Sequence, residues 1–354
     1  MTYGKIILFI IAIAALGAAI WYYQKDKEID PGLNDSNLEI QEAEINSEIT
    51  ESEGGPVSTG ASQGGQVEHS VSIPALINKQ YDGRDLVLGD ILDDNSVYTR
   101  YYITYKSGEL AISGILNLPK GQGPFPLLIL NHGHIDTDLY TNGRGLRREQ
   151  DYLARTGYAV LHTDYRNHAQ SGKDGRDDLA VRLSYAEDAV NAVYAVRDAK
   201  LESVDASRVG MLGHSMGGGV TLSSLVIDPD LIDAAVLYAP VSGNMQDSYH
   251  RWIERRPESA SKIVELYGSP ETAPDFWGDV NAENFYSRIS APVKIFHGTA
   301  DSSVPLAWSQ ETLALLQSAG KDGSLVIYDN APHEFVLDWQ NFMEETKKFF
   351  DKNI

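Results

Sequence analysis

The stretch "VGMLGHSMGGGV", residues 209–220, joins a short apolar run to a serine flanked by glycines. Three kinds of structure contain such a stretch: a loop that cradles a phosphate, a turn that lets a helix pack closely, and an elbow that lifts a catalytic serine out of a sheet. A Walker loop would end in Gly-Lys-Ser/Thr, and a dinucleotide fingerprint would read Gly-x-Gly-x-x-Gly near the start of the domain. Neither pattern is present. Close packing would explain the glycines at 217–219 but would not require Ser215.

The sequence around this stretch predicts an α/β fold. Short runs rich in Val, Ile and Leu alternate with helical stretches; the runs are PLLILNHG, YAVLHTDY, RVGMLGHS, AAVLYAP, VKIFHG and LVIYDN. Continuous apolar runs of this length are typical of strands buried on both faces, so we expect a mostly parallel twisted sheet with helices on both faces. The helices are predicted near 145–156, 178–200, 216–226, 306–319 and 334–350. At the front edge, residues 98–119 predict an antiparallel hairpin around the turn Lys106-Ser107-Gly108.

One connection is too long for this pattern. About fifty residues, 241–291, separate AAVLYAP from VKIFHG, and they contain several aromatic and arginine side chains. Long connections are often lids over an active site. The segment is therefore interpreted either as a helical cap before the next strand or as a helical excursion that packs on the sheet edge.

Ligands of open parallel sheets bind beyond the carboxyl ends of the strands, and polar residues follow four of the predicted strands. Ser215 follows a buried strand and opens a helix, and Gly213 and Gly217 leave room where a larger side chain would collide. A serine needs a base to take its proton and a carboxylate to orient that base. His333 and Asp301 are the best candidates, because they follow later strands in the chain order Ser, Asp, His of α/β-hydrolases. Glu334 and Asp329 are alternative acids, although both lie close in sequence to the histidine.

An oxyanion that develops during acyl transfer needs fixed donors. The backbone N–H of Met216 is the first candidate, and the second is that of His134, with Gly133 as the other choice. The same loop suggests a metal site as an alternative, with His132, His134, His162 and His168 as possible ligands. Because no carboxylate cluster accompanies these histidines, we predict neither a metal nor another cofactor.

Together these motifs resemble a known family. GHSMGGG, HGTAD and PHEF, with NHGH and DYRNHAQSG upstream, are similar to the catalytic domain of the prolyl oligopeptidase-like serine hydrolases (peptidase family S9) and to the dienelactone-hydrolase-like group. The resemblance covers about residues 98–352. It implies the α/β-hydrolase fold, with Ser215 as nucleophile, Asp301 as orienting acid and His333 as base.

The resemblance also bears on the substrate. Many members of that family carry a β-propeller before the catalytic domain, whereas only residues from about 70 to 97 are available here, and one blade needs about forty residues. We therefore expect no propeller. The predicted activity is that of a serine-type peptidase acting through an acyl-enzyme, and the alternative is an esterase acting on small or sugar-linked acyl groups. A non-catalytic binding module would be expected to lack a triad residue, and none is missing.

Composition narrows the possible partners. The 354-residue chain has a net charge of −21 and no Lys/Arg-rich stripe, so we exclude nucleic acid and expect a small-molecule ester or peptide as substrate. There is no cysteine, which excludes disulfides, thiolate metal ligands and a cysteine nucleophile.

The N-terminal part predicts attachment to a membrane. Residues 6–23 contain no charge and end in the aromatic cluster Trp21, Tyr22 and Tyr23, so residues 1–24 are predicted to be a single uncleaved membrane anchor. A cleavable signal peptide is the alternative, because small residues at 17–19 follow a shorter apolar region. Residues 25–70 read as an acidic disordered linker, and 71–354 as the catalytic domain. The short N-terminal tail would place this domain outside the cytoplasm.

Overall fold

The computed structural model describes residues 69–174 and 182–354. The predicted anchor, 1–24, and all but the last two residues of the predicted linker, 25–70, lie outside these residues. Among the described residues, no helix is both long enough and apolar enough to span a membrane.

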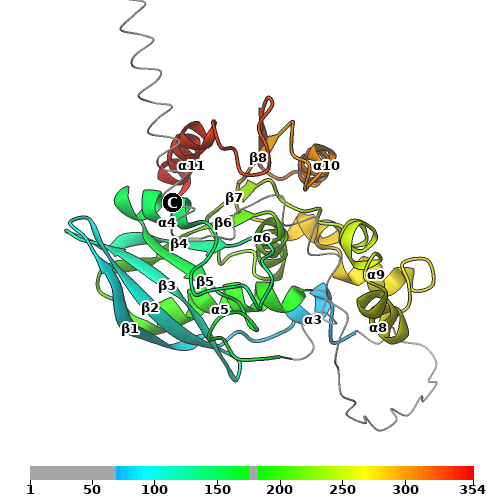
Figure 1. Cartoon of the computed structure of the whole chain (residues 1–354), viewed down its shortest axis with the longest axis horizontal. Coiled ribbons are helices and arrows are strands. Elements are labelled where there is room, and N and C mark those ends of the chain that lie inside the picture. Colours follow the sequence, from blue (N-terminus) through cyan, green and yellow to red (C-terminus); the bar gives the residue numbers. More distant parts are fainter. Residues whose placement is uncertain (1–68, 175–181) are drawn as a thin grey trace, which may run out of the picture. The chain divides into compact units, whose positions relative to one another are not determined.

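Nine strands form one mixed sheet in the order β1-β2-β3-β5-β4-β6-β7-β8-β9 (Figure 1). Their bounds are β1 Arg84–Asp94, β2 Tyr98–Ser107, β3 Leu110–Pro119, β4 Phe125–Asn131, β5 Ala159–Thr163, β6 Val204–His214, β7 Ala234–Tyr238, β8 Val293–Gly298 and β9 Gly323–Tyr328. The strands from β5 to β9 along this order pair in parallel, whereas β1, β2, β3 and β5 pair antiparallel. The predicted fold class is therefore confirmed.

The helices lie on both faces of the sheet (Figure 1). Before the long connection they are α3 Ile73–Ile77, α4 Arg147–Arg155, α5 Leu183–Ala199 and α6 Met216–Ile227; after it they are α10 Leu306–Ser318 and α11 Trp339–Asn353. The connection itself holds α7 Met245–Ser248, the π-helix η2 Tyr249–Ile253, α8 Pro257–Tyr267, α9 Pro274–Val280 and the 3-10 helix η3 Ala282–Arg288. The 241–291 insertion is thus helical, as predicted.

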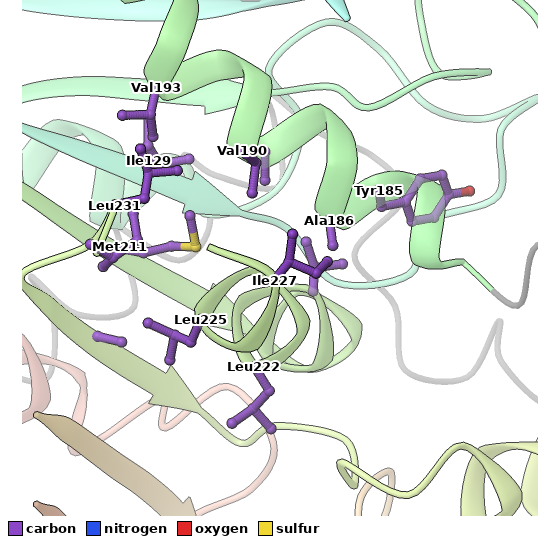
Figure 2. Close-up of a cluster of buried hydrophobic side chains, with 14 of the residues drawn as sticks. Ile129, Tyr185, Ala186, Val190, Val193, Met211, Leu222, Leu225, Ile227 and Leu231 are labelled. Carbon is purple, nitrogen blue, oxygen red and sulfur yellow. The ribbon is translucent and has the colours of Figure 1, made fainter. Parts of the chain in front are cut away.

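Alternation along the central strands builds two cores. On β4, Leu127 and Ile129 join the core under α5 and α6, whereas Leu128 and Leu130 join the core under α4 and α11. Figure 2 shows part of the first core, in which Val190 of α5 lies near side chains of the sheet. Because every residue of β4 from 127 to 130 is fully buried, its sequence is uniformly apolar rather than alternating.

Three details differ from the prediction. The hairpin turn lies one residue later, because Lys106 and Ser107 still pair in β2 and Gly108, with φ of 57°, begins the turn. The last helix begins at Trp339 rather than near 334. The strand β1 was not predicted, because it is an edge strand most of whose apolar residues are exposed and whose register is broken by irregularities. Neither a buried run nor a strict alternation marks such a strand in a sequence.

Candidate active site

Ser215 occupies the turn between β6 and α6 in a conformation that few residues adopt. Its φ is 54° and its ψ is −119°, outside the regions normally open to a side chain with a Cβ. Three backbone hydrogen bonds hold it there: its N–H donates to the Tyr238 carbonyl at 2.9 Å, and its own carbonyl accepts from Gly218 at 2.9 Å and Val241 at 3.0 Å. This geometry is that of a nucleophile elbow. Residues 209–220 therefore form the serine elbow, rather than a phosphate loop or a turn that only lets a helix pack closely.

The glycines around Ser215 are required by backbone contacts. A Cβ added at Gly213 would lie 2.1 Å from the Gly217 carbonyl oxygen, and one added at Gly217 would lie 2.0 Å from the Asn131 carbonyl oxygen. Real Cβ atoms essentially never approach so closely. The glycines therefore let α6 begin directly against β4 and β6, which places Ser215 at the carboxyl edge of the sheet.

His333 and Asp301 meet at the same edge. His333, in the loop after β9, has its Nδ1 2.6 Å from Oδ2 of Asp301, which lies in the loop after β8. The His333 ring also lies 4.6 Å, centroid to centroid, from that of His214, the residue before Ser215. The alternative acid Asp329 is engaged elsewhere, since it accepts hydrogen bonds from Thr299 and Asn330. The structure thus brings Asp301 to His333 and His333 to the elbow.

The Asp301 carboxylate is held in its charged form. Its side chain is fully buried, and Oδ1 accepts hydrogen bonds from the backbone N–H groups of Ser303 and Val304, each at 2.9 Å. Burial acts to raise the pKa of Asp301, but hydrogen bonds from His297 and His333 outweigh it and hold this pKa well below its ordinary value. A carboxylate in this state can orient a neighbouring imidazole and stabilise its protonated form.

The first predicted oxyanion donor, Met216, directly follows Ser215 in the chain. The second, His134, lies in the loop after β4. Met216 is the first residue of α6, where backbone N–H groups have no partner within the helix. In the loop, Gly133 comes so close that an added Cβ would lie 3.2 Å from the Ser215 Cβ. His134 follows it with an exposed side chain.

Positive charge gathers beside these donors, which was not predicted. The Nη1 of Arg182 lies 3.3 Å from the Met216 sulfur. Desolvation, and then the charges of Arg182 and Arg256, lower the pKa of His134. Two arginines, Arg182 and Arg256, thus act on His134 in a chain whose net charge is −21.

The remaining histidines of the metal alternative are part of a buried polar core. The His132 ring stacks against those of Tyr140 and His162 at 4.8 and 5.4 Å, and burial lowers the pKa of His132 to about 3. His168 lies edge-on to His132 at 5.3 Å. Across residues 69–174 and 182–354, no three His, Asp or Glu side chains are grouped as a metal would require.

This core is organised by Asp164, the first residue of DYRNHAQSG. Its fully buried carboxylate accepts hydrogen bonds from the Ser113 hydroxyl at 2.6 Å, the Tyr140 hydroxyl at 2.7 Å, the Asn142 amide at 2.6 Å and the Gly143 N–H at 2.8 Å. Ser113 belongs to β3, and the other three belong to the loop that carries His134. Asp164 therefore fixes the oxyanion loop to the sheet.

The helical insertion is tied to the loop that carries Asp301. Arg251 donates to the carbonyls of Ser303 at 3.0 Å and Ser302 at 3.1 Å, and Trp252 packs edge-on against Trp308 of α10 at 5.6 Å. A cavity of about 360 Å³ lies elsewhere, at the amino end of β6, and takes no part in the site.

A strained serine elbow with a His–Asp pair at the carboxyl edge of a mostly parallel sheet defines the α/β-hydrolase class. Within that class, residues 144–354 match the model of the prolyl oligopeptidase family, and the chain belongs to this family of serine hydrolases. The resemblance seen in the sequence is therefore confirmed.

Relatives with curated names include peptidases and an esterase. The chain is 23% identical to Esterase EstD of Thermotoga maritima over 75% of its own length and 66% of the esterase. It is 25% identical to Dipeptidyl aminopeptidase BIII of Pseudoxanthomonas mexicana over 69% of its own length and 34% of that protein. The chain thus spans less than two thirds of both relatives.

Solved structures agree on the fold. A putative dipeptidyl aminopeptidase IV from Bacteroides ovatus matches with a TM-score of 0.61 at 20% identity, covering 74% of this chain and 37% of the other. Acetyl Xylan Esterase 1 from Thermoanaerobacterium matches with a TM-score of 0.59 at 17% identity, covering 79% and 92%. At these identities the likeness concerns the fold alone.

Proposed function

We propose that the chain hydrolyses an acyl bond through Ser215, His333 and Asp301, with a covalent acyl-enzyme intermediate. The observation that carries this proposal is the 2.6 Å contact between His333 and Asp301 at the edge where Ser215 stands on its strained elbow. A structural histidine on the surface would not require a fully buried carboxylate behind it, and a packing turn would not require a serine with positive φ.

In this proposal each group has its own step. Because Nδ1 of His333 faces Asp301, Nε2 is the nitrogen available to take the Ser215 proton as Oγ attacks the carbonyl carbon. The carbonyl oxygen becomes an oxyanion, which the N–H groups of Met216 and His134 would stabilise. Collapse of this intermediate breaks the acyl bond, and the leaving amine or alcohol takes the proton from His333. Water then enters, gives a proton to His333 and attacks the acyl carbon. As this second intermediate collapses, the bond to Ser215 Oγ breaks, Oγ takes the proton back from His333, and the acid leaves.

The proposed substrate is a peptide, which makes the chain a serine-type peptidase. Membership of the prolyl oligopeptidase family and the similarity to a dipeptidyl aminopeptidase support this assignment.

An esterase is the second candidate, and two observations favour it. The similarity to an esterase covers 75% of this chain, more than the 69% covered by that aminopeptidase. Residues 84–94, directly before the predicted hairpin, form β1 of the same sheet, so they are not part of a propeller blade. This supports the esterase because the peptidases of the family that the sequence resembles often carry a propeller before the catalytic domain.

Labelling with a fluorophosphonate tests the shared chemistry, since this reagent reacts with an activated serine. The wild type should label and Ser215→Ala should not; failure of the wild type to label would remove the nucleophile assignment. Ser223→Ala, a change to a buried serine of α6, is a matched control that should still label. A panel of p-nitrophenyl esters and aminoacyl p-nitroanilides then separates esterase from peptidase, because only a peptidase should turn over the anilides.

We also propose that residues 1–24 anchor the protein to a membrane with the catalytic domain outside the cytoplasm. The support is the uncharged run at 6–23 and its aromatic end. Alkaline carbonate extraction should leave the full chain in the membrane fraction. Added protease should remove the domain from intact cells, and protection until lysis would contradict the orientation.

A further inference from the structure

A second histidine lies behind the proposed catalytic acid. His297, in β8, is fully buried, and its Nε2 is 3.1 Å from Oδ2 of Asp301, the oxygen that also faces His333. The sequence motif HGTAD contains both His297 and Asp301, but the proposed mechanism uses only the acid. Two imidazoles therefore meet one carboxylate oxygen.

The partners of His297 determine where its hydrogen lies. Nε2 also lies 3.0 Å from the carbonyl oxygen of Val304. Both neighbours of Nε2 are acceptors, since a carbonyl oxygen and a carboxylate have no hydrogen to give, so Nε2 must carry the proton. On the other side of the ring, Nδ1 lies 2.7 Å from the hydroxyl of Ser309, which is fully buried in α10. The Ser309 hydroxyl can donate to Nδ1, and in that arrangement the ring is neutral.

We propose that neutral His297 is a positioning residue, which fixes the Asp301 carboxylate and shares its charge with His333. This inference rests on the proposed function. With the N–H groups of Ser303 and Val304 on Oδ1 and the two histidines on Oδ2, both oxygens are held from both sides and the carboxylate has no free rotation. Ser309 sets the tautomer of His297, as outer-shell partners set that of ligand histidines.

The inference predicts a change in the pH dependence as well as in rate. Without the His297 N–H, the Asp301 carboxylate would present more of its charge to His333 and would favour the protonated imidazole. The acid limb of the kcat/KM profile would then move to higher pH. Other titratable or charged groups near His333 include His214, from the end of β6, Arg148 of α4, whose charge reaches His214, and Glu334, the next residue in the chain. The substitution changes none of them.

The test compares His297→Ala, His297→Gln and Ser309→Ala with His250→Ala, a change to an exposed histidine of the insertion. We expect His297→Ala to lower kcat about 10- to 100-fold with KM nearly unchanged, because a misplaced base slows the chemical step. Its acid limb should move up by a few tenths of a pH unit. His297→Gln, whose amide N–H can reach Asp301, should restore much of the rate. Ser309→Ala should show a smaller loss of kcat, and His250→Ala none.

Several outcomes would overturn the inference. A folded His297→Ala enzyme with the wild-type kcat and acid limb would reduce His297 to a packing role. An upward shift of more than one pH unit would mean that His297 is charged in the wild type, against the neutral form proposed. If His297→Ala does not fold, a wild-type kcat and acid limb in Ser309→Ala would overturn the inference instead. Absence of fluorophosphonate labelling in the wild type would instead count against the proposed function.

Discussion

The contact between Gly217 and Asn131 allows a prediction whose size follows from the coordinates. Gly217→Ala would place a Cβ 2.0 Å from the Asn131 carbonyl oxygen, and ordinary contact begins at 3.4 Å, so α6 must retreat by about 1.4 Å. β4 cannot yield instead, because it is paired on both sides with β5 and β6. Such overpacking costs about 1–3 kcal/mol, from which the better helix propensity of alanine returns up to about 1 kcal/mol.

The net loss, up to about 3 kcal/mol, should lower Tm by at most about 10 °C. The effect on activity should be larger, since a displacement of about 1 Å at the nucleophile costs on the order of 100-fold in rate. Differential scanning fluorimetry and the rate constant of fluorophosphonate labelling measure the two quantities. Gly278→Ala, in α9, is the control, because its added Cβ would meet only the Asn284 amide nitrogen, at an ordinary 3.7 Å. Wild-type Tm and labelling rate in Gly217→Ala would refute the reasoning.

Three further predictions concern charge. Asp301→Asn should lower kcat on the order of 10⁴-fold, since an amide neither orients nor stabilises the protonated His333. Because the folded pKa of Asp301 is depressed, the stability it adds is present above about pH 4 and lost on acidification, so the Tm difference between wild type and Asp301→Asn should narrow below that pH. Burial and neighbouring carboxylates raise the pKa of Glu283 to about 7, so the folded protein loses stability as pH rises and Glu283 ionises. Glu283→Gln should therefore raise Tm at pH 8 but hardly at pH 4.5. Thermal melts across this pH range measure the difference. Arg182→Gln should reduce kcat/KM for the anionic p-nitrophenyl hemisuccinate several-fold more than for the neutral p-nitrophenyl butyrate, and added salt should shrink this difference. The control Arg84→Gln, in the edge strand β1, should not change the ratio of the two kcat/KM values. Equal effects of the two changes on this ratio would count against a local role of Arg182.

The sequence contains most of the information for the central sheet and for the order of the site residues. Buried parallel strands need apolar residues on both faces, so β4, β6 and β8 can be recognised in the sequence as continuous apolar runs. Ser215, Asp301 and His333 each follow the end of a strand, which is why their order could be predicted. What could not be predicted depends on contacts between distant segments. The approach of Arg182 to Met216 joins the start of α5 to that of α6, and no local pattern encodes it.

His297 shows the same limit within a recognised motif. The HGTAD sequence places it four residues before Asp301, but that spacing alone does not say that its ring turns toward the carboxylate. The orientation depends on Ser309, which belongs to the following helix, and on the Val304 carbonyl. A histidine in a loop and a buried histidine with three partners look alike in a sequence, because burial is a property of the assembled fold.

The hydrogen bonds of Asp164 have a consequence for how activity is gained and lost. They connect β3, the loop after β4 and the end of β5, so the oxyanion loop can take its shape only after these three segments have assembled. A partly folded chain could already form the helix that follows Ser215, but without the ordered oxyanion loop it could not bind a substrate carbonyl. Activity should therefore disappear together with tertiary structure in a single cooperative transition, and turnover can serve as a reporter of complete folding.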